Sequence, residues 1–342
     1  MEEFKVSAKS PSNIAIVKYW GKHGNQLPNN PSVSFTLSRC HTETQILCKN
    51  NASSNGYRLD FHFEGKDSPK FKEKIEKYLV ENQQYFDFLN GLDLSIESYN
   101  SFPHSSGIAS SASSMSALVL CLLQIEKIVN KDVSQIDLRK ASFLSRLASG
   151  SAARSVFPIM SLWGATPSVP MSSDEYAVPL ADMVAPVFKT YHDSIMIVSN
   201  KEKSVSSRAG HSLMNGHPLA EQRYATARRN TEQLLKVLRE GDVEEFIKIA
   251  EAEALQLHEM MATSNPPYHL MEPNTLKIIE LVKKYRNETK TPICFTLDAG
   301  PNVHVLYPDV IEERVKHFIK DELIHYCHEY KWIDDKVQID NI

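Results

Sequence analysis

The sequence contains no run of about 18 apolar residues, and its N-terminus carries no apolar segment of the secretory-signal kind. We therefore expect neither membrane insertion nor secretion. There is also no excess of basic residues, because the net charge is −4 and lysine and arginine are scattered along the chain. A nucleic-acid partner is not indicated. The five cysteines form no C-x-x-C pair, which favours reduced, buried thiols and a cytoplasmic location.

The remaining composition is that of a globular protein. Hydrophobic residues make up 42% of the 342 residues and charged residues 23%, so nothing indicates a disordered or fibrous chain. This length is sufficient for two compact domains, each with its own core. Prolines become frequent between residues 167 and 186, and we place the boundary within or near this stretch, which gives domains 1–185 and 186–342.

The order of elements predicts an α+β fold. The runs 42–47 and 57–63, separated by a turn-rich segment, predict a pair of strands joined by that turn. A helix is expected over 71–88, and the basic cluster Lys70–Lys77 is interpreted as its solvated face. Residues 186–342 predict a β-α-β-β-α-β plan with extra helices. We also expect strands at 6–9, 13–18, 33–37, 92–99, 194–198, 293–297, 303–306 and near 337. One further helix should end near 127, and another should begin at 134–137 and end near 147. The other expected helices are 219–239, 243–261, 274–285 and 310–319.

The stretch Phe102–Ala112 joins a small-residue loop to an apolar helical segment that ends near Lys127. The free backbone N–H groups and the dipole of a helix start attract anions, and serine hydroxyls can donate to phosphate or bind Mg²⁺. An ordinary capped helix is the alternative. The loop lacks the G-x-x-x-x-G-K-[ST] pattern, so a P-loop NTPase is not supported. Its pattern P-x-x-x-G-[LI]-x-S-S-A resembles the phosphate loop of the GHMP small-molecule kinase superfamily.

Three further stretches carry residues that suit catalysis or anion binding. Lys18 and Lys22 flank a Tyr-Trp pair between two predicted strands and can approach one polyanion from different directions. Arg154 follows small residues that let a ligand approach the backbone, and its planar fork fits a carboxylate or phosphate. Asp298 closes an apolar strand before a tight turn. Taken singly, these stretches can equally be a solvated loop, a packed helix start with a surface arginine, and a turn-forming aspartate.

Taken in order, the four stretches resemble one family, mevalonate 5-diphosphate decarboxylase, over nearly the whole chain. The matching segments are Asn13–Lys22, Phe102–Ala112, Ser149–Arg154 with the pattern S-G-S-A-x-R, and Asp298–Asn302 with the sequence D-A-G-P-N. The resemblance implies a two-domain GHMP-kinase-like fold, with an ATP-binding N-terminal part like ribosomal protein S5 domain 2 and a ferredoxin-like C-terminal part. It also implies a homodimer and ATP-dependent decarboxylation of (R)-5-diphosphomevalonate to isopentenyl diphosphate, with ADP, phosphate and CO₂.

The resemblance further implies roles for individual residues. Asp298 would be the base that takes the proton of the substrate's 3-hydroxyl, Lys18 would hold Asp298 ionised, and Arg154 would orient the substrate carboxylate. The substrate-binding residues would be Tyr19, Trp20, Gly21, Lys22, Lys74, Ser149, Gly150, Ser151, Ser207 and Arg208. The ATP-binding residues would be Ser105, Ser106, Gly107, Ala109, Ser110 and Ser111, with Mg²⁺ at Ser111.

The sequence departs from the family pattern at three places. Phe157–Met160 replaces the usual Gly-Gly pair and allows Pro158 to shift the pocket wall, His104–Ser106 replaces Thr-Ala-Ala, and His211 replaces Met. These changes leave the acid-base groups intact, but they make a related decarboxylase of mevalonate 5-phosphate an alternative. A mevalonate 3-kinase that stops after phosphorylation is a second alternative. A non-catalytic ligand sensor is a third, although neither the base nor the phosphate loop is lost.

Overall fold

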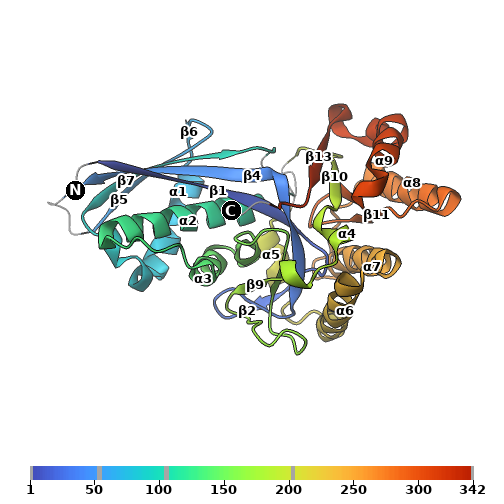
Figure 1. Ribbon diagram of the computed structural model, residues 1–342, viewed down its shortest axis with the longest axis horizontal. Helices are drawn as coiled ribbons and strands as arrows, with labels where there is room; N and C mark the ends of the chain where they lie inside the picture. The colour runs from blue at the N-terminus through green and yellow to red at the C-terminus, as the bar shows by residue number, and fades with distance from the viewer. Residues whose placement is uncertain (1–2, 52–55, 104–107, 202–204, 340–342) are drawn as a thin grey trace.

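The computed structural model describes residues 3–51, 56–103, 108–201 and 205–339. Figure 1 shows two parts side by side, each built from a β-sheet with helices packed on it. The first half of the chain forms one part, and the second half forms the other, as the change from blue and green to orange and red shows. The arrangement confirms the expected α+β fold.

The first sheet is organised around β4 (Ser32–Asn50), a strand of 19 residues. β1 (Phe4–Ala15) runs antiparallel along one edge of β4, while β8 (Met160–Trp163) and β7 (Leu92–Asn100) share the other edge. Side chains alternate between buried and more exposed along the second half of β4, because helices cover only one face of the sheet. The remaining strands are β5 (Arg58–Phe63), β6 (Lys66–Asp67) and β9 (Ala177–Pro179), with a separate hairpin of β2 (Lys22–His23) and β3 (Leu27–Pro28).

The predicted pairing of residues 42–47 with 57–63 is wrong. β7 lies between β4 and β5, antiparallel to β4 and parallel to β5. Parallel neighbours need a crossover connection, which α1 (Pro69–Glu81) supplies between β5 and β7, so closeness in the chain did not indicate pairing here. The predicted separate runs on either side of Pro11 join into β1, because a register shift between Pro11 and Asn13 lets the strand pass the proline.

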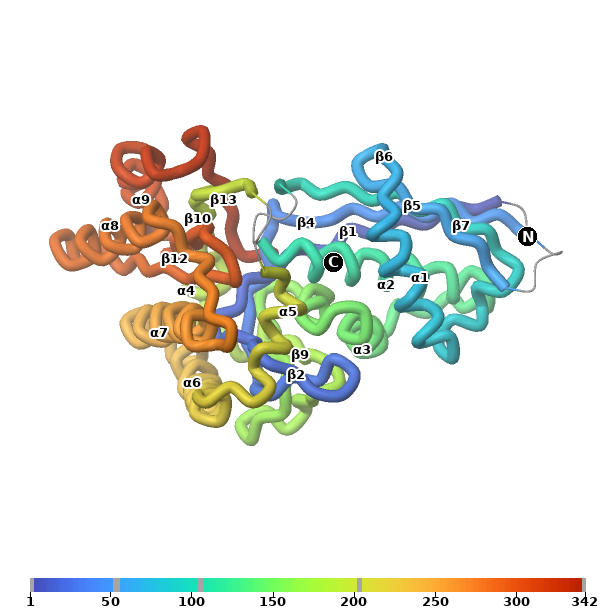
Figure 2. The backbone as a smooth tube through the Cα atoms, turned by 180° about the vertical axis from the view of Figure 1, so that it is seen from behind, coloured from blue at the N-terminus to red at the C-terminus, as the bar shows by residue number. Residues whose placement is uncertain are grey.

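The core of the first part is built around α2 (Ser110–Asn130), most of whose residues from Ala112 to Ile125 are buried. Ala109 precedes the helix with a left-handed φ of 36°, so the chain turns sharply into it. Among the described residues, α2 is the one helix that is long and apolar enough to cross a membrane by length and composition, and 67% of its apolar window is buried inside the protein. Figures 1 and 2 place it beneath β1 and β4, so packing in the core accounts for its apolar character.

The other two helices of this part differ from their predicted bounds. α1 ends at Glu81 instead of Phe88, and short 3₁₀ turns follow at Gln83–Tyr85 and Asp87–Leu89. α3 (Leu138–Ala148) begins after Asp137, whose carboxylate accepts hydrogen bonds from the backbone N–H groups of Arg139 and Lys140 at 2.8 and 3.3 Å. Asp137, the last residue of the predicted opening at 134–137, is therefore the N-cap.

The second sheet is antiparallel, with the strand order β11 (Cys294–Thr296), β12 (Val303–Tyr307), β10 (His192–Met196) and β13 (Trp332–Lys336). The first strand in the chain thus lies between the third and the fourth, which confirms the predicted β-α-β-β-α-β plan. α5 lies between the two parts in both views (Figures 1 and 2). The helices of this part are α4 (Pro186–Lys189), α5 (Ser207–Ser212), α6 (Ala220–Glu240), α7 (Val243–Ala262), α8 (Pro273–Thr289) and α9 (Glu312–Phe318). A π-helical turn at Ile319–Leu323 continues α9, and short 3₁₀ turns lie at Ala181–Met183, Asp309–Ile311, Ile324–Tyr326 and His328–Tyr330.

The two parts are joined through β4 and β13. Buried Asp335 accepts hydrogen bonds from the backbone N–H groups of Ser38, Arg39 and Cys40 at 3.0, 2.8 and 2.7 Å. This junction holds the two parts in a defined relation, which matters because the site described below draws residues from both. The boundary at 185/186 lies between β9 and α4 and stays a prediction.

Candidate active site

One cleft collects residues from both parts of the structure. It has a volume of about 840 Å³ and is lined by the segment after β1, by α1, by the starts of α2 and α5, by the 149–154 segment and by the turn after β11. Of the predicted residues that the structure describes, Gly21 does not line the cleft, and Ser105, Ser106 and Gly107 lie outside the described residues. Those that line it are Lys18, Tyr19, Trp20, Lys22, Lys74, Ala109, Ser110, Ser111, Ser149, Gly150, Ser151, Arg154, Ser207, Arg208 and Asp298.

Lys18 and Asp298 form an ion pair in this cleft. The Nζ of Lys18 lies 3.2 Å from Oδ1 of Asp298 and donates a second hydrogen bond to the carbonyl oxygen of Ala15 at 2.5 Å. The Lys18 side chain is 2% exposed and that of Asp298 is 24% exposed, so the carboxylate is the member that a ligand can reach. Burial lowers the pKa of Lys18, while the negative charges of Asp298 and Glu253 oppose this shift. The pair offers a proton acceptor that is supported by a buried cation.

The turn after β11 presents Asp298 through its backbone. The N–H of Gly300 donates to the main-chain oxygen of Asp298 at 2.7 Å, and Nε2 of His258 donates to the same oxygen at 3.1 Å. The carboxylate accepts from Lys18. Asp298 is therefore held at the cleft for a ligand, in contrast to an aspartate whose side chain serves only its own turn.

Arg154 is buried at the end of the S-G-S-A-x-R segment and is held from two sides. Its Nε donates to Oδ1 of Asn13 at 3.3 Å, and its Nη1 donates to Oγ of Ser32. Burial lowers the pKa of Arg154 to about 10, although the negative charge of Asp298 opposes the shift. The arginine is thus a fixed cation beside the ion pair and not a surface group. Pro158, expected to shift the wall, is not among the lining residues.

Tyr19 forms a wall of the cleft together with Gly150. The Tyr19 ring centroid lies 4.7 Å from that of Trp163 and 4.4 Å from that of His211. A Cβ atom at Gly150 would lie 2.8 Å from the hydroxyl of Tyr19 and 2.8 Å from Cη2 of Trp163, so only glycine fits there. Within the described part of the chain, the buried Tyr19 hydroxyl has no hydrogen-bond partner. Burial raises the pKa of Tyr19, so the phenol stays protonated as a donor for a ligand.

Lys22, Lys74 and Arg208 bring three positive charges together from β2, α1 and α5. Burial and then the charge of Arg208 lower the pKa of Lys22. Burial, Arg208 and Lys22 lower the pKa of Lys74 to about 8. None of the three forms a salt bridge with a described residue, and the Nζ of Lys22 donates to Oε1 of Gln26 at 2.7 Å. Like charges without a counter-ion destabilise one another, so this end of the cleft is built for a polyanion.

In the basic cluster Lys70–Lys77, the exposed Lys70 and Lys77 agree with a solvated helix face, whereas Lys74 is half-buried and departs from that interpretation. Lys70, Lys74 and Lys77 line the cleft. They recur at a spacing of four and three residues, which places them on one face of α1. The periodic spacing was visible in the sequence, but only the packed structure shows that this face meets α5 across the cleft.

His211, on α5, is a site residue that the sequence marked only as a departure from the family pattern. It lines the cleft, with its ring centroid 4.4 Å from Tyr19 and 4.6 Å from Trp20. The N–H of Gly21 donates to its Nδ1 at 3.0 Å, so the neutral ring carries its proton on Nε2. Burial and the charges of Lys22 and Arg154 lower the pKa of His211 to about 3. His211 is therefore a neutral hydrogen-bond donor between the cations Lys22 and Arg154. Gly21 contributes to the site through its hydrogen bond, which orients the His211 ring.

The start of α2 also reaches the cleft. Ala109, Ser110 and Ser111 line it, and Oγ of Ser149 donates to Oγ of Ser111 at 3.4 Å. The first turn of a 21-residue helix leaves backbone N–H groups unbonded, and these carry the positive end of the dipole. An anion that enters the cleft meets this end together with the serine hydroxyls.

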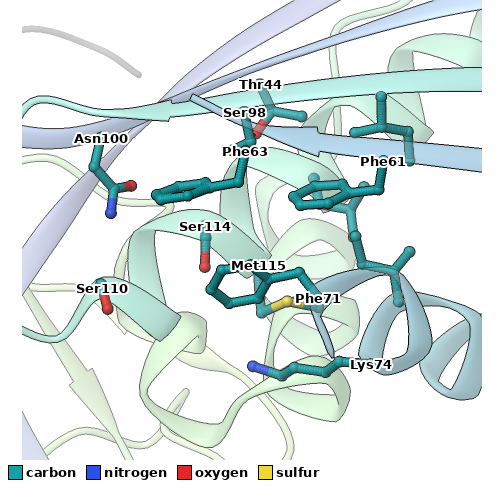
Figure 3. A pocket seen from close by; sticks show the side chains of 13 residues that line it. Thr44, Phe61, Phe63, Phe71, Lys74, Ser98, Asn100, Ser110, Ser114 and Met115 are labelled. Atoms are coloured by element: carbon teal, nitrogen blue, oxygen red, sulfur yellow. The ribbon is translucent and has the colours of Figure 1, made fainter. Parts of the chain in front are cut away.

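An apolar pocket adjoins the helix start. Figure 3 shows Phe61, Phe63 and Phe71 with Met115 around it, and the polar side chains of Ser110 and Asn100 on its other side. Lys74 and Ser110 line both this pocket and the cleft, so the two spaces are neighbours. Flat aromatic surfaces with a few amide and hydroxyl groups suit a planar heterocycle.

Family models match both parts of the chain. A model described as the diphosphomevalonate decarboxylase-like N-terminal domain matches residues 10–177. A model described as the mevalonate 5-diphosphate decarboxylase C-terminal domain matches residues 194–340. The first match contains the first sheet from the second half of β1 to the start of β9, and the second contains almost all of the second sheet.

Relatives and solved structures are similar over nearly the whole chain. The diphosphomevalonate decarboxylase of Ganoderma lucidum is 29% identical over 345 residues, which is 94% of this chain and 84% of the relative. The solved mevalonate diphosphate decarboxylase of Staphylococcus aureus has a TM-score of 0.84 at 27% identity, and the match covers 98% of this chain and 96% of that one. A solved structure described as MDDEF in complex with MVAPP, AMPPCP and magnesium has a TM-score of 0.80 at 26% identity, and the match covers 98% of this chain and 97% of that one. These matches confirm the expected two-domain fold.

Proposed function

The chain belongs to the mevalonate diphosphate decarboxylase family, and we therefore propose that it catalyses the ATP-dependent decarboxylation of (R)-5-diphosphomevalonate to isopentenyl diphosphate, ADP, phosphate and CO₂. The observation that carries this proposal is the ion pair of Lys18 and Asp298 at 3.2 Å, with its reachable carboxylate in the same cleft as buried Arg154. Such a cleft can bind an anionic substrate and remove one of its protons.

The first step of the proposed reaction makes a leaving group. A tertiary 3-hydroxyl leaves poorly, so it must first become a phosphate. We assign Asp298 as the base, because its carboxylate can take the hydroxyl proton as the oxygen attacks the γ-phosphorus of ATP and the bond to ADP breaks. The ammonium group of Lys18 donates to the Asp298 carboxylate at 3.2 Å and offsets negative charge as the phosphoryl group transfers.

The second step releases CO₂. The phosphate departs with the electron pair of the C–O bond, while the C–C bond to the carboxylate breaks and its pair forms the double bond. We assign Arg154 to orient the carboxylate, because its fork is buried and held by Asn13 and Ser32. A fixed cation limits the motion of the carboxylate before it leaves.

We assign the substrate's diphosphate to the cluster of Lys22, Lys74 and Arg208. The three uncompensated charges favour a 5-diphosphate over the 5-phosphate of the alternative decarboxylase. Tyr19 adds an unpartnered hydroxyl donor. Gly21 contributes through its hydrogen bond to His211. The remaining assigned residues line the pocket directly: Trp20, Ser149, Gly150, Ser151 and Ser207.

We assign ATP to the helix start and the neighbouring apolar pocket. Ala109, Ser110 and Ser111 would meet its phosphates, and the pocket of Figure 3 suits its base. Mg²⁺ prefers oxygen ligands, and the exposed hydroxyl of Ser111 beside phosphate oxygens fits that preference. When bound, Mg²⁺ supplies charge neutralisation at the phosphates. Ser105, Ser106 and Gly107 stay predictions for the same role.

The proposal is tested by CO₂ release. Substrates labelled with ¹⁴C at C1 are supplied with ATP and Mg²⁺ as mevalonate, its 5-phosphate and its 5-diphosphate. Labelled gas from the 5-diphosphate, in step with ADP, supports the proposal. Consumption of ATP without labelled gas would indicate the 3-kinase, and saturable binding without ADP would indicate a sensor. The homodimer and the cytoplasmic location stay predictions, the first open to sedimentation equilibrium.

A further inference from the structure

The backbone of Lys18 is held by a buried ion pair that comes from α6 and α7. Glu253 accepts a hydrogen bond from the N–H of Lys18 through Oε2 at 2.8 Å, and Arg223 donates from Nη2 to the main-chain oxygen of Lys18 at 3.2 Å. Arg223 and Glu253 also bond each other twice, at 2.9 and 2.5 Å. Both side chains are 0% exposed. This ion pair therefore hydrogen-bonds both the backbone N–H and the backbone carbonyl oxygen of Lys18.

Lys18 needs such partners because it lies beyond the sheet. β1 ends at Ala15, so no neighbouring strand of the ladder pairs with the backbone of Lys18. Buried backbone N–H and C=O groups must find partners, and here two charged side chains and Asn30, which donates to the same oxygen at 3.0 Å, provide them. A buried ion pair is weak evidence for stability, since removing two charges from water is costly. The location of the Arg223–Glu253 pair is therefore better explained by positioning of Lys18 than by stabilisation of the fold.

We propose that the Arg223–Glu253 pair is a positioning device that fixes the ammonium group of Lys18 against Asp298. Neither residue lines the cleft, so both act through Lys18 and not on the substrate. This inference rests on the proposed function, in which Lys18 supports the base.

The pair also affects the charge of Lys18. The charged groups that face Lys18 are Asp298 after β11, Arg154 in the S-G-S-A-x-R segment, Glu253 on α7 and Arg223 on α6. Burial lowers the pKa of Lys18, and the charge of Glu253 partly reverses that shift. Loss of this charge must lower the pKa of Lys18 further. Because the protonated form supports catalysis, activity would then decline at a lower pH.

The chain offers a matched control on the same helix. Glu251 pairs with Arg286 of α8 through two bonds at 2.5 and 3.0 Å, and Arg286 also donates to the carbonyl of Ile293 at 2.8 Å. This pair has the same chemistry, with side chains that are 21% and 11% exposed, and it supports α8 and β11 in place of Lys18. The variants are Glu253→Gln and Arg223→Lys, with Glu251→Gln and Arg286→Lys as controls.

Three measurements are made on each full-length variant: urea unfolding, the pH dependence of kcat and KM, and a ¹³C NMR titration of the labelled Lys18 side chain, assigned by Lys18→Arg. For Glu253→Gln we expect kcat to fall about 10²-fold with little change in KM, as for other small misplacements of catalytic groups. The alkaline limb of the pH profile of kcat and the NMR titration midpoint of Lys18 should both move down by about one pH unit. Arg223→Lys keeps both charges but loses the fork, so kcat should fall while the titration stays in place.

The controls should also lose unfolding free energy, because each disrupts a charge-paired hydrogen bond, but they should keep the kcat and the Lys18 titration of the parent protein. Equal losses of kcat in Glu253→Gln and Glu251→Gln, with an unmoved Lys18 signal, would overturn the inference. If Glu253→Gln does not fold, the inference is tested by comparing kcat of Arg223→Lys, which should fall, with kcat of Arg286→Lys, which should not. If the parent protein releases no CO₂, the proposed function fails, and the NMR titration still tests the effect of Glu253 on Lys18.

Discussion

The Nζ of Lys18 lies 3.2 Å from Oδ1 of Asp298, although 280 positions separate the two residues along the chain. Lys18 follows β1 in the first part of the structure, and Asp298 follows β11 in the second. The pairing therefore requires the two parts to keep their relation, which the bonds of Asp335 to the backbone of β4 support. A site of this kind is sensitive both to its own groups and to the junction between the parts.

Replacement of the base should stop the reaction and leave binding largely intact. Asp298→Asn keeps the shape of the side chain but cannot take a proton, so we expect kcat to fall by about 10²–10⁴-fold with a modest change in KM. Steady-state kinetics with the 5-diphosphate measure this. Asp182→Asn, which removes the same charge at an exposed position, is the control. Near-normal turnover of Asp298→Asn would place the base elsewhere.

Removal of one cation should weaken binding of the diphosphate. In Arg208→Ala the substrate loses a charge-assisted contact, so KM for the 5-diphosphate should rise by about 10–100-fold while kcat falls less. The exposed Arg239 of α6 lies outside the cleft, and Arg239→Ala is the matched control for loss of charge. An unchanged KM in Arg208→Ala would remove Arg208 from the substrate site.

The lowered pKa of Lys74 predicts a pH dependence of substrate binding. Its pKa is about 8, below the ordinary 10.5, so the side chain loses its charge as the pH rises through about 8. KM for the 5-diphosphate should therefore be higher at pH 9 than at pH 7. In Lys74→Arg the charge persists over this range, and the rise in KM should be smaller. The same rise in parent and variant would show that another group is responsible.

His211 should link stability to pH in the acidic range. Its pKa is lowered from 6.5 to about 3, so between these values the unfolded chain binds a proton that the folded protein does not. The free energy of unfolding must then fall as the pH decreases, by about 1.4 kcal/mol per pH unit well below 6.5. His211→Asn offers an oxygen to the N–H of Gly21 but does not titrate.

Urea unfolding at pH 5, 6 and 7 measures this effect. The difference in unfolding free energy between the parent protein and His211→Asn should shrink steadily toward pH 5. Parallel pH dependences would contradict a buried neutral imidazole at this position.

Local patterns were sufficient for much of the fold. The four motifs, the long apolar helix that became α2 and the β-α-β-β-α-β plan of the second part were all recognisable, because spacing and turn residues act over a few positions. The strand order beside β4 was not, because β7, which follows β5 in the chain, lies between β4 and β5. The sequence placed the start of α3 only within 134–137, and the structure identifies Asp137 as its N-cap, because helix boundaries depend on local hydrogen bonds.

The amino-acid order was enough to indicate which residues carry chemistry: Lys18, Arg154 and Asp298 stand in recognisable motifs. It did not indicate that Lys70 and Lys77 line the cleft, how His211 is oriented, or that Arg223 pairs with Glu253. These depend on which helix faces meet when two sheets and their helices pack together. Motifs are set by neighbours in the chain, whereas burial and charge are set by neighbours in space, which emerge only on folding.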